Sequence, residues 1–152
     1  MKRRGAIRTI ALALVLLCHT IAPAGEPARL RILISNDDGI EAPGIAALFD
    51  ALSRLGTVTV AAPSQGRSAT SHGIVTDGPI LVRESDRKGA RWYAIDALPA
   101  TCVRLALENL LETPPDIVVS GVNRGENLGV VTFYSATVAC ARASTWSASI
   151  RP

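Results

Sequence analysis

The segment from Arg31 to Gly44, RILISNDDGIEAPG, constrains the fold of this chain more than any other. Its first part predicts a strand over 31–35, because a near-continuous apolar run is typical of a parallel strand covered on both faces. Asp37 and Asp38 follow at the carboxyl end of that strand, and Pro43 begins an amphipathic helix. Ligands bind at the carboxyl ends of strands in open α/β sheets. The segment therefore predicts an α/β fold with two carboxylates at its ligand-binding edge.

The elements predicted downstream alternate between strand and helix. A helix over 43–55, stopped by Gly56, leads to a strand over 57–62, which makes a right-handed parallel βαβ unit. Together the predicted elements form a three-layer α/β sandwich with a mainly parallel sheet and a Rossmann-like core. The remaining elements are an antiparallel hairpin of 80–83 with 91–95 around SDRKG, a helix over 99–111, a strand over 116–120, and a helix over 138–143 capped by Ser135.

The amino-terminal residues 1–24 have the pattern of a secretory signal peptide. Basic residues at 2–4 precede an apolar core at 10–18, and a small-x-small sequence closes the segment at 22–24. That core is too short to span a bilayer comfortably, although an uncleaved anchor is the alternative. We expect an exported, periplasmic protein with no membrane span after cleavage, and a folded domain over 30–152.

The charge of the chain argues against a nucleic-acid partner. The formal net charge is +3, but four of the 16 basic residues lie in the predicted leader. The remainder carries 12 Lys and Arg against 13 Asp and Glu. A basic surface stripe is therefore not expected.

Cysteine and histidine are too sparse for a zinc site. After the predicted leader only Cys102, Cys140 and His72 remain, with no CxxC or Cys/His ligand spacing. Both cysteines fall in apolar helical patterns. They are either buried thiols or a disulfide, and the sequence leaves both open.

Polar loops follow three of the predicted parallel strands, and their residues offer oxygen ligands. Asp37 and Asp38 supply carboxylates, Ser68 a hydroxyl, and Asn123 an amide oxygen. The carboxyl ends of parallel strands meet at one edge, so these groups should converge. An incomplete shell of oxygen ligands suits Mg²⁺ or Mn²⁺.

Four motifs in this order resemble the SurE family of metal-dependent 5′/3′-nucleotidases, over about residues 30–143. They are RILISNDDGIEAPG, VAAPSQGRSATSHGIVT, PDIVVSGVNRGENLG and YSATVACA. The resemblance implies hydrolysis of nucleoside 5′- and 3′-monophosphates to nucleoside and phosphate, with a divalent cation as cofactor. It also implies that the metal is held by Asp37, Asp38, Ser68 and Asn123. Family members are usually cytoplasmic, which is the alternative to export.

The resemblance suggests roles for further polar residues. Asp37 and Asp38 are the expected catalytic residues, with Asp37 as metal ligand and as nucleophile or orienter of the attacking water. His72 is a candidate proton donor or phosphate contact. The candidate phosphate-binding residues are Asn36, Asn127, Ser135 and Thr137, the last two with help from the helix start behind them.

The chain departs from the family pattern at several places. Ala136 stands where the family usually has Gly, so its methyl group is expected to crowd the phosphate. Thr101 stands where a helix-capping Asp is usual, and it is expected to cap instead. Family chains also continue further, with more strands and an arm used in oligomer contacts. We therefore expect a fold incomplete at its carboxyl end, with an exposed sheet edge and apolar surface and without the family's homo-oligomer. The alternative function is a non-catalytic fragment that at most binds metal or nucleotide.

Two other α/β classes fail on specific residues. A receiver domain of two-component signalling needs an Asp ending the third strand and a late Lys, but the only lysine after the leader is Lys88 in the hairpin turn. A dinucleotide-binding Rossmann domain needs GxGxxG after its first strand, which is absent.

Overall fold

The structure, a computed structural model, describes residues 29–149, with side chains described through Thr145. The signal peptide predicted over 1–24 lies outside the described residues. A single five-stranded sheet has the order β3-β4-β2-β1-β5. The strands are β1 (Leu30–Ser35), β2 (Gly56–Pro63), β3 (Val82–Arg87), β4 (Ala90–Ile95) and β5 (Ile117–Ser120).

Four of these strands run parallel, and only β3 is antiparallel, to β4. The predicted α/β class with a mainly parallel sheet is confirmed. The helices are α2 (Pro43–Leu52), α3 (Pro99–Leu105), the π-helical turn η2 (Ala106–Leu110), the 3₁₀ turn η3 (Gly129–Phe133) and α4 (Ala136–Ser149).

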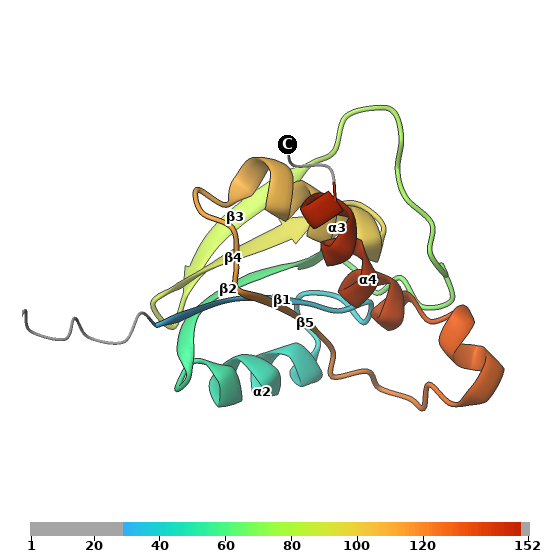
Figure 1. The fold of residues 1–152 in the computed structure, drawn as a ribbon, viewed down its shortest axis with the longest axis horizontal. Helices are drawn as coiled ribbons and strands as arrows, with labels where there is room; N and C mark the ends of the chain where they lie inside the picture. The colour runs from blue at the N-terminus through green and yellow to red at the C-terminus, as the bar shows by residue number, and fades with distance from the viewer. Residues whose placement is uncertain (1–28, 150–152) are drawn as a thin grey trace, which may run out of the picture.

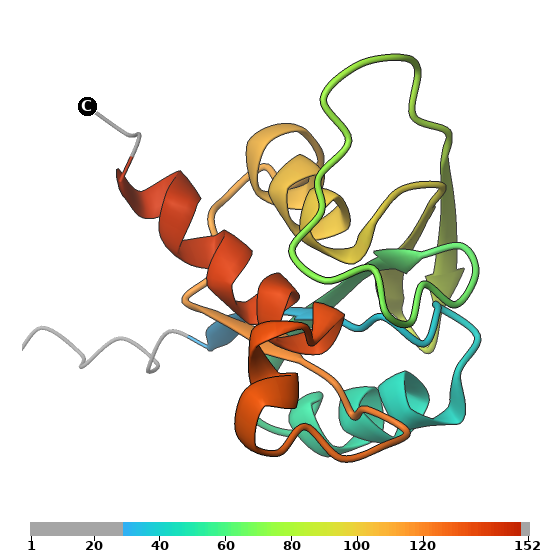
Figure 2. The same ribbon diagram turned by 90° about the vertical axis from the view of Figure 1, so that its right-hand side faces the viewer.

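Helices cover both faces of the sheet, which explains the apolar runs in the parallel strands. Helix α2 lies on one face, and α3 and α4 lie together on the other (Figures 1 and 2). Successive strand residues point to opposite faces. Ile34 accordingly packs in one core with Ile45 of α2, whereas Leu33 packs in the second core with Val103 and Cys140.

The first helix is shorter than predicted. It begins at Pro43 as expected but ends at Leu52, and Leu55 is 62% exposed rather than part of the buried stripe. Gly56 does not stop the helix; it is the first residue of β2 and pairs with Leu30. The close approach of the two backbones explains why Gly stands there.

The hairpin turn is tighter than predicted. The SDR of SDRKG belongs to β3, and the turn is the two-residue Lys88–Gly89, with φ of 51° and 75°. Two positive φ values are typical of the tight turn that matches strand twist. Arg87 is held by the carboxylate of Glu41 at 2.5 and 2.9 Å, and its guanidinium lies 5.1 Å from the Trp92 ring centroid.

The last two helices differ from prediction in detail. The helix predicted over 99–111 starts at Pro99, but its last turn is π-helical. Thr101 does not cap it; the Thr101 hydroxyl instead accepts a hydrogen bond from the Val75 amide at 2.9 Å. Helix α4 is longer than predicted, and the expected cap is confirmed, because Ser135 Oγ accepts from the Val138 amide at 3.2 Å.

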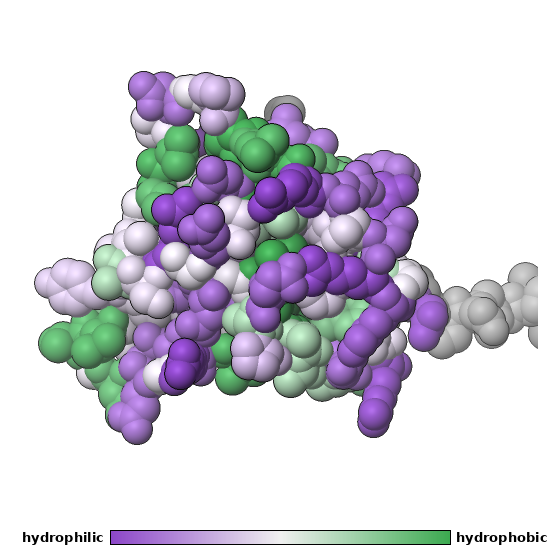
Figure 3. Space-filling view, turned by 180° about the vertical axis from the view of Figure 1, so that it is seen from behind, coloured by the Kyte–Doolittle hydropathy of each residue, from purple (hydrophilic) through white to green (hydrophobic). Residues whose placement is uncertain are grey.

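Strand β5 forms one edge of the sheet, and the chain beyond it exposes much apolar surface. Ile117 on that edge is 48% exposed. Figure 3 shows apolar side chains gathered where η3 projects, at the left of that view. The exposed large apolar residues after β5 are Val122, Leu128, Val130, Val131, Phe133 and Tyr134. The sheet edge and apolar surface predicted to be exposed are therefore both present.

Within residues 29–149, the structure contains no helix with the length and apolar character needed to cross a bilayer.

Candidate metal and phosphate site

Three of the predicted site residues meet at the carboxyl edge of the sheet. Asp37 follows β1, Asn123 follows β5, and Thr137 lies in the first turn of α4. The Thr137 hydroxyl lies 2.5 Å from Asp37 Oδ1 and 3.2 Å from Asn123 Oδ1. The shorter distance identifies Asp37 as the acceptor of its single proton. Residues 100 positions apart in the chain are thus in direct contact.

Asp38 ties the β1 turn to the β5 loop. Its Oδ2 accepts a hydrogen bond from the backbone amide of Arg124 at 3.0 Å. The side-chain amide of Asn123 donates to the Gly125 carbonyl at 2.8 Å, which fixes its Oδ1 toward Thr137. The two carboxylates and the amide oxygen are therefore held by the protein itself.

The tight turn after β1 is built around Asn36 and Gly39. The Asn36 side chain donates to the Gly39 carbonyl at 3.0 Å. Gly39 has φ of +99°, and a Cβ there would lie 3.0 Å from backbone atoms of Gln65 and Gly66. The Asp37 carbonyl accepts from the Arg67 amide at 2.7 Å. The loop after β2 is therefore fastened against the turn that carries the carboxylates.

The Asp37 carboxylate is buried without a cationic partner. It is 6% exposed, and each ion pair found among residues 29–149 uses a different carboxylate. A buried carboxylate is costly unless a cation or several hydrogen bonds compensate it. Here the one side-chain donor is a neutral hydroxyl. The site therefore fits a bound cation.

Further oxygen atoms at this edge lack partners. Asn36 Oδ1 is buried and unpaired in the part of the chain that the structure describes. Ser35 Oγ and Ser120 Oγ are also buried, and the group nearest to pairing with them is the Cys140 thiol. No group of three His, Cys, Asp or Glu side chains forms a metal site there. A cation at Asp37 and Asp38 would thus need hydroxyl, amide or water oxygens as well. Such a donor set fits a hard divalent ion such as Mg²⁺ or Mn²⁺.

Three other predicted residues are not joined to this cluster by hydrogen bonds within residues 29–149. Ser68 is exposed, in the loop after β2. Asn127 accepts through its carbonyl from the Thr132 hydroxyl at 3.1 Å. His72 lines a separate small pocket with Arg104 and Arg142, where α3 and α4 pack together.

Ala136 is accommodated within the fold. It is 1% exposed at the start of α4, directly before Thr137. A residue covered to that extent presents almost no surface to a ligand. The crowding of a bound phosphate by this methyl group stays a prediction.

The two cysteines are buried free thiols of α3 and α4. Cys102 and Cys140 are both buried and unpaired. Burial raises the pKa of the Cys140 thiol to about 11, and burial also raises the pKa of Cys102. Both are therefore protonated at neutral pH and are not nucleophiles. The Cys140 thiol lies 3.8 Å from the Asn36 carbonyl as a weak donor.

Arg124 was missed by sequence reasoning, although it directly follows Asn123. It lines a pocket of about 690 Å³ together with Asp38, Glu41, Gln65 and Asn123. The sequence feature that could have identified Arg124 is its position directly after Asn123, a predicted metal ligand. Sequence alone does not show which polar residues of the loop share a pocket with the carboxylates.

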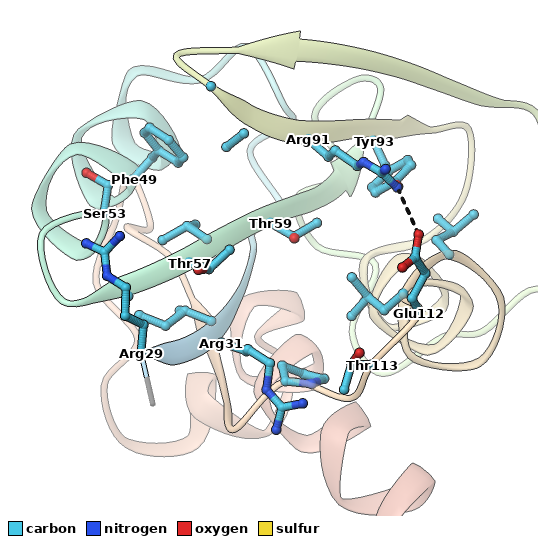
Figure 4. A pocket seen from close by; sticks show the side chains of 18 of the residues that line it. Arg29, Arg31, Phe49, Ser53, Thr57, Thr59, Arg91, Tyr93, Glu112 and Thr113 are labelled. Atoms are coloured by element: carbon cyan, nitrogen blue, oxygen red, sulfur yellow. Dashed lines mark ion pairs between the residues drawn. The ribbon is translucent and has the colours of Figure 1, made fainter. Parts of the chain in front are cut away.

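A second large pocket lies at the opposite, amino-terminal end of the strands. Figure 4 shows its lining side chains, including Arg31 and Arg91. Both are already paired: Arg31 with Asp116 at 2.6 Å, and Arg91 with Glu112 at 3.9 Å. The Arg31 hydrogen bond holds the pKa of Asp116 down to about 2. These charges join elements of the fold and do not mark a second catalytic site.

The fold and the site define a Rossmann-like α/β protein with an oxygen-rich, buried acidic site at the carboxyl edge of its parallel strands. Residues 32–149 match the profile of the family described as survival protein SurE. The chain belongs to the SurE family.

Relatives of known identity agree with this assignment. The chain is 50% identical over 120 residues to a 5′-nucleotidase SurE of Synechococcus sp. strain RCC307, covering 76% of this chain and 44% of that protein. It is 51% identical over 116 residues to that of Desulforudis audaxviator, covering 74% and 45%. The crystal structure of SurE from Aquifex aeolicus matches with a TM-score of 0.71 and 39% identity, over 77% of this chain and 47% of that one. The chain thus spans a little under half the length of these relatives.

Proposed function

We propose that this protein is a metal-dependent phosphatase that hydrolyses nucleoside 5′-monophosphates, and 3′-monophosphates as well, to nucleoside and phosphate. The observation that carries the proposal is the buried Asp37 carboxylate, which is joined to Asn123 through the Thr137 hydroxyl and has no cationic side-chain partner among residues 29–149. Relatives named 5′-nucleotidase SurE support the substrate class. The leader-like pattern of residues 1–24 supports action after export to the periplasm.

The residues proposed to hold a divalent cation are Asp37, Asp38, Ser68 and Asn123. When bound, such a cation neutralises phosphoryl oxygens and lowers the pKa of water. For Ser68 to contribute, the exposed loop that carries it has to bring the hydroxyl to the carboxylates.

The proposed roles of the protein groups follow from their contacts. Thr137 donates its proton to Asp37 and so orients that carboxylate. Thr137 also remains a proposed phosphate contact, because it lies in the first turn of α4. The Ser135 oxygen accepts from Val138, which leaves the Ser135 proton and the amino end of α4 to bind phosphate. Asn36 and Asn127 remain proposed contacts of the phosphate or of the residues around it. In the reaction, water attacks phosphorus, the ester P–O bond breaks, and the leaving nucleoside oxygen takes a proton.

Metal removal tests the proposal. After treatment of the purified chain with EDTA, we expect phosphate release from adenosine 5′-monophosphate to fall to background, because Asp37 and Asp38 alone repel the substrate dianion. Added Mn²⁺ or Mg²⁺ should restore it, and adenosine 3′-monophosphate should be tested in parallel. Activity unchanged by EDTA would contradict metal dependence.

The second candidate function is a non-catalytic fragment that binds metal or nucleotide. The unpaired β5 edge and the exposed apolar residues after it support this candidate, because they are the surfaces that an incomplete sheet would leave uncovered. It predicts that Mn²⁺ raises the unfolding temperature while no phosphate is released. The same samples therefore separate the two functions.

His72 gives a prediction about the proton donor. Because it lines a pocket with Arg104 and Arg142 and makes no hydrogen bond to the carboxylates in the described chain, we expect His72→Gln to lower kcat less than about tenfold. The pH dependence of kcat should keep its acidic and basic limbs. A loss above a hundredfold with one limb missing would instead establish His72 as the proton donor.

A further inference from the structure

Arg124 supplies a cationic side chain in the pocket that is lined by Asp38 and Asn123, two of the proposed metal ligands. Its backbone amide is bound to Asp38 Oδ2 at 3.0 Å, which fixes the start of its side chain beside the proposed metal ligands. Among the residues that line this pocket it is the one Lys or Arg. It is exposed and has no ion-pair partner in the part of the chain described by the structure.

Within the described chain, the two carboxylates that line the pocket with Arg124 form no ion pair with its guanidinium. Glu41 lines the same pocket, but both of its oxygens are bonded to the Arg87 guanidinium. The Arg87 hydrogen bond lowers the pKa of Glu41, so this carboxylate stays ionised and paired. Asp38 accepts the backbone amide of Arg124, not its guanidinium.

The negative charge of a bound phosphate would be compensated by a guanidinium at this site. Asp37 and Asp38 carry two negative charges, which a divalent cation would cancel. A phosphate dianion bound next to them then has only neutral hydroxyl and amide donors from α4. A planar guanidinium with several donors matches two phosphate oxygens at once, which a lysine ammonium does not.

We propose that Arg124 is a catalytic residue that binds the phosphoryl group of the substrate and stabilises its charge during hydrolysis. This inference rests on the proposed phosphatase function. It assigns the pocket lined by Asp38, Asn123 and Arg124 to the phosphoryl group of the substrate.

The test compares Arg124→Gln and Arg124→Lys with the parent chain, all with Mn²⁺. Equilibrium binding of inorganic phosphate is measured by calorimetry, and kcat and KM are measured with adenosine 5′-monophosphate. We expect Arg124→Gln to weaken phosphate binding about tenfold and to lower kcat/KM about 10- to 100-fold, since a charge-assisted hydrogen bond is lost. Arg124→Lys should recover part of both, and Mn²⁺ binding should be unchanged in all variants.

Arg142→Gln is the matched control. Arg142 is also exposed and also makes no ion pair within residues 29–149, but it lines the small pocket beside His72 instead. It should change both readouts less than twofold. Phosphate binding and kcat/KM of Arg124→Gln within threefold of the parent would overturn the inference while leaving the phosphatase intact. If the parent chain binds phosphate but does not hydrolyse the substrate, the phosphate affinities of the parent and of Arg124→Gln still test the role of Arg124. A parent chain that neither binds nor hydrolyses overturns the proposed function and this inference together.

Discussion

Replacing Asp37 with Asn should abolish hydrolysis while leaving the fold intact. We expect kcat to fall on the order of 10³-fold, the scale seen when one member of a catalytic set is removed. The substitution keeps the shape of the side chain, and its oxygen can still accept the Thr137 proton. The substitution removes the negative charge of a residue that is only 6% exposed and has no cationic partner among the described residues.

The same variant makes a second, independent prediction about stability. Without metal, Asp37→Asn should unfold at the same or a higher temperature than the parent, because an uncompensated buried charge is destabilising. With Mn²⁺ in excess the parent should gain stability, about 2.7 kcal/mol at a hundred times the dissociation constant, and the variant should gain almost none. Thermal unfolding with and without Mn²⁺ measures both effects.

Asp50→Asn is the control for these measurements. Asp50 is a surface carboxylate on α2 that pairs with Lys88 at 2.5 Å, away from the carboxyl edge of the sheet. It should leave both the activity and the response to Mn²⁺ unchanged. An Asp37→Asn chain with more than a tenth of the parent activity would show that this carboxylate is not the centre of the site.

The sequence predicts the part of the site that depends on sheet topology. Asp37 and Asn123 each follow a parallel strand, and Ser135 caps the helix that brings Thr137 to them. Parallel strands place their carboxyl ends at one edge whatever the details of packing. The convergence of Asp37 and Asn123 therefore follows from the parallel arrangement of β1 and β5. The contact of Thr137 with Asp37 depends in addition on how α4 packs on the sheet.

The conformations of loops and element ends depend on contacts that no local pattern encodes. Ser68 and His72 lie in the long segment between β2 and β3, where side chains have no periodicity and each backbone turn is set by distant partners. Thr101 shows the same effect: its hydroxyl binds Val75 of that segment instead of capping its own helix. Proximity to the site could be predicted for the loop as a whole, but not for each of its residues.

Gly56 shows how a residue can be placed in the wrong element for a sound local reason. A Gly after an amphipathic run usually ends a helix, and the helix does end nearby, at Leu52. The reason for Gly at this position is different, because it is buried in the first pair of the β1–β2 ladder, opposite Leu30. A helix pattern depends only on residues that are close along the chain. The need for Gly at position 56 comes from the backbone of Leu30 in another strand.

Gly56→Ala should therefore destabilise the protein strongly, by about 3 kcal/mol or more, at the upper end of overpacking effects. A Cβ at this position would lie 2.0 Å from the Leu30 carbonyl oxygen and 2.8 Å from its carbon. Both are backbone atoms, so no side chain can rotate to relieve the clash. The start of β1 would have to separate from β2, which also disturbs the strand that delivers Asp37. Urea unfolding followed by the fluorescence of the buried Trp92 measures the loss.

Gly125→Ala separates this steric effect from the general effect of replacing Gly. At Gly125 the nearest atom to an added Cβ is 3.8 Å away, an ordinary contact, and the residue lies in an exposed loop. Its free energy of unfolding should stay within about 0.5 kcal/mol of the parent, as for most surface substitutions. If Gly56→Ala also costs less than about 1 kcal/mol, β1 and β2 are not held as closely at this pair as the structure shows. The position of Asp37 would then depend on its contacts with Thr137 and Arg67 rather than on the register of the sheet.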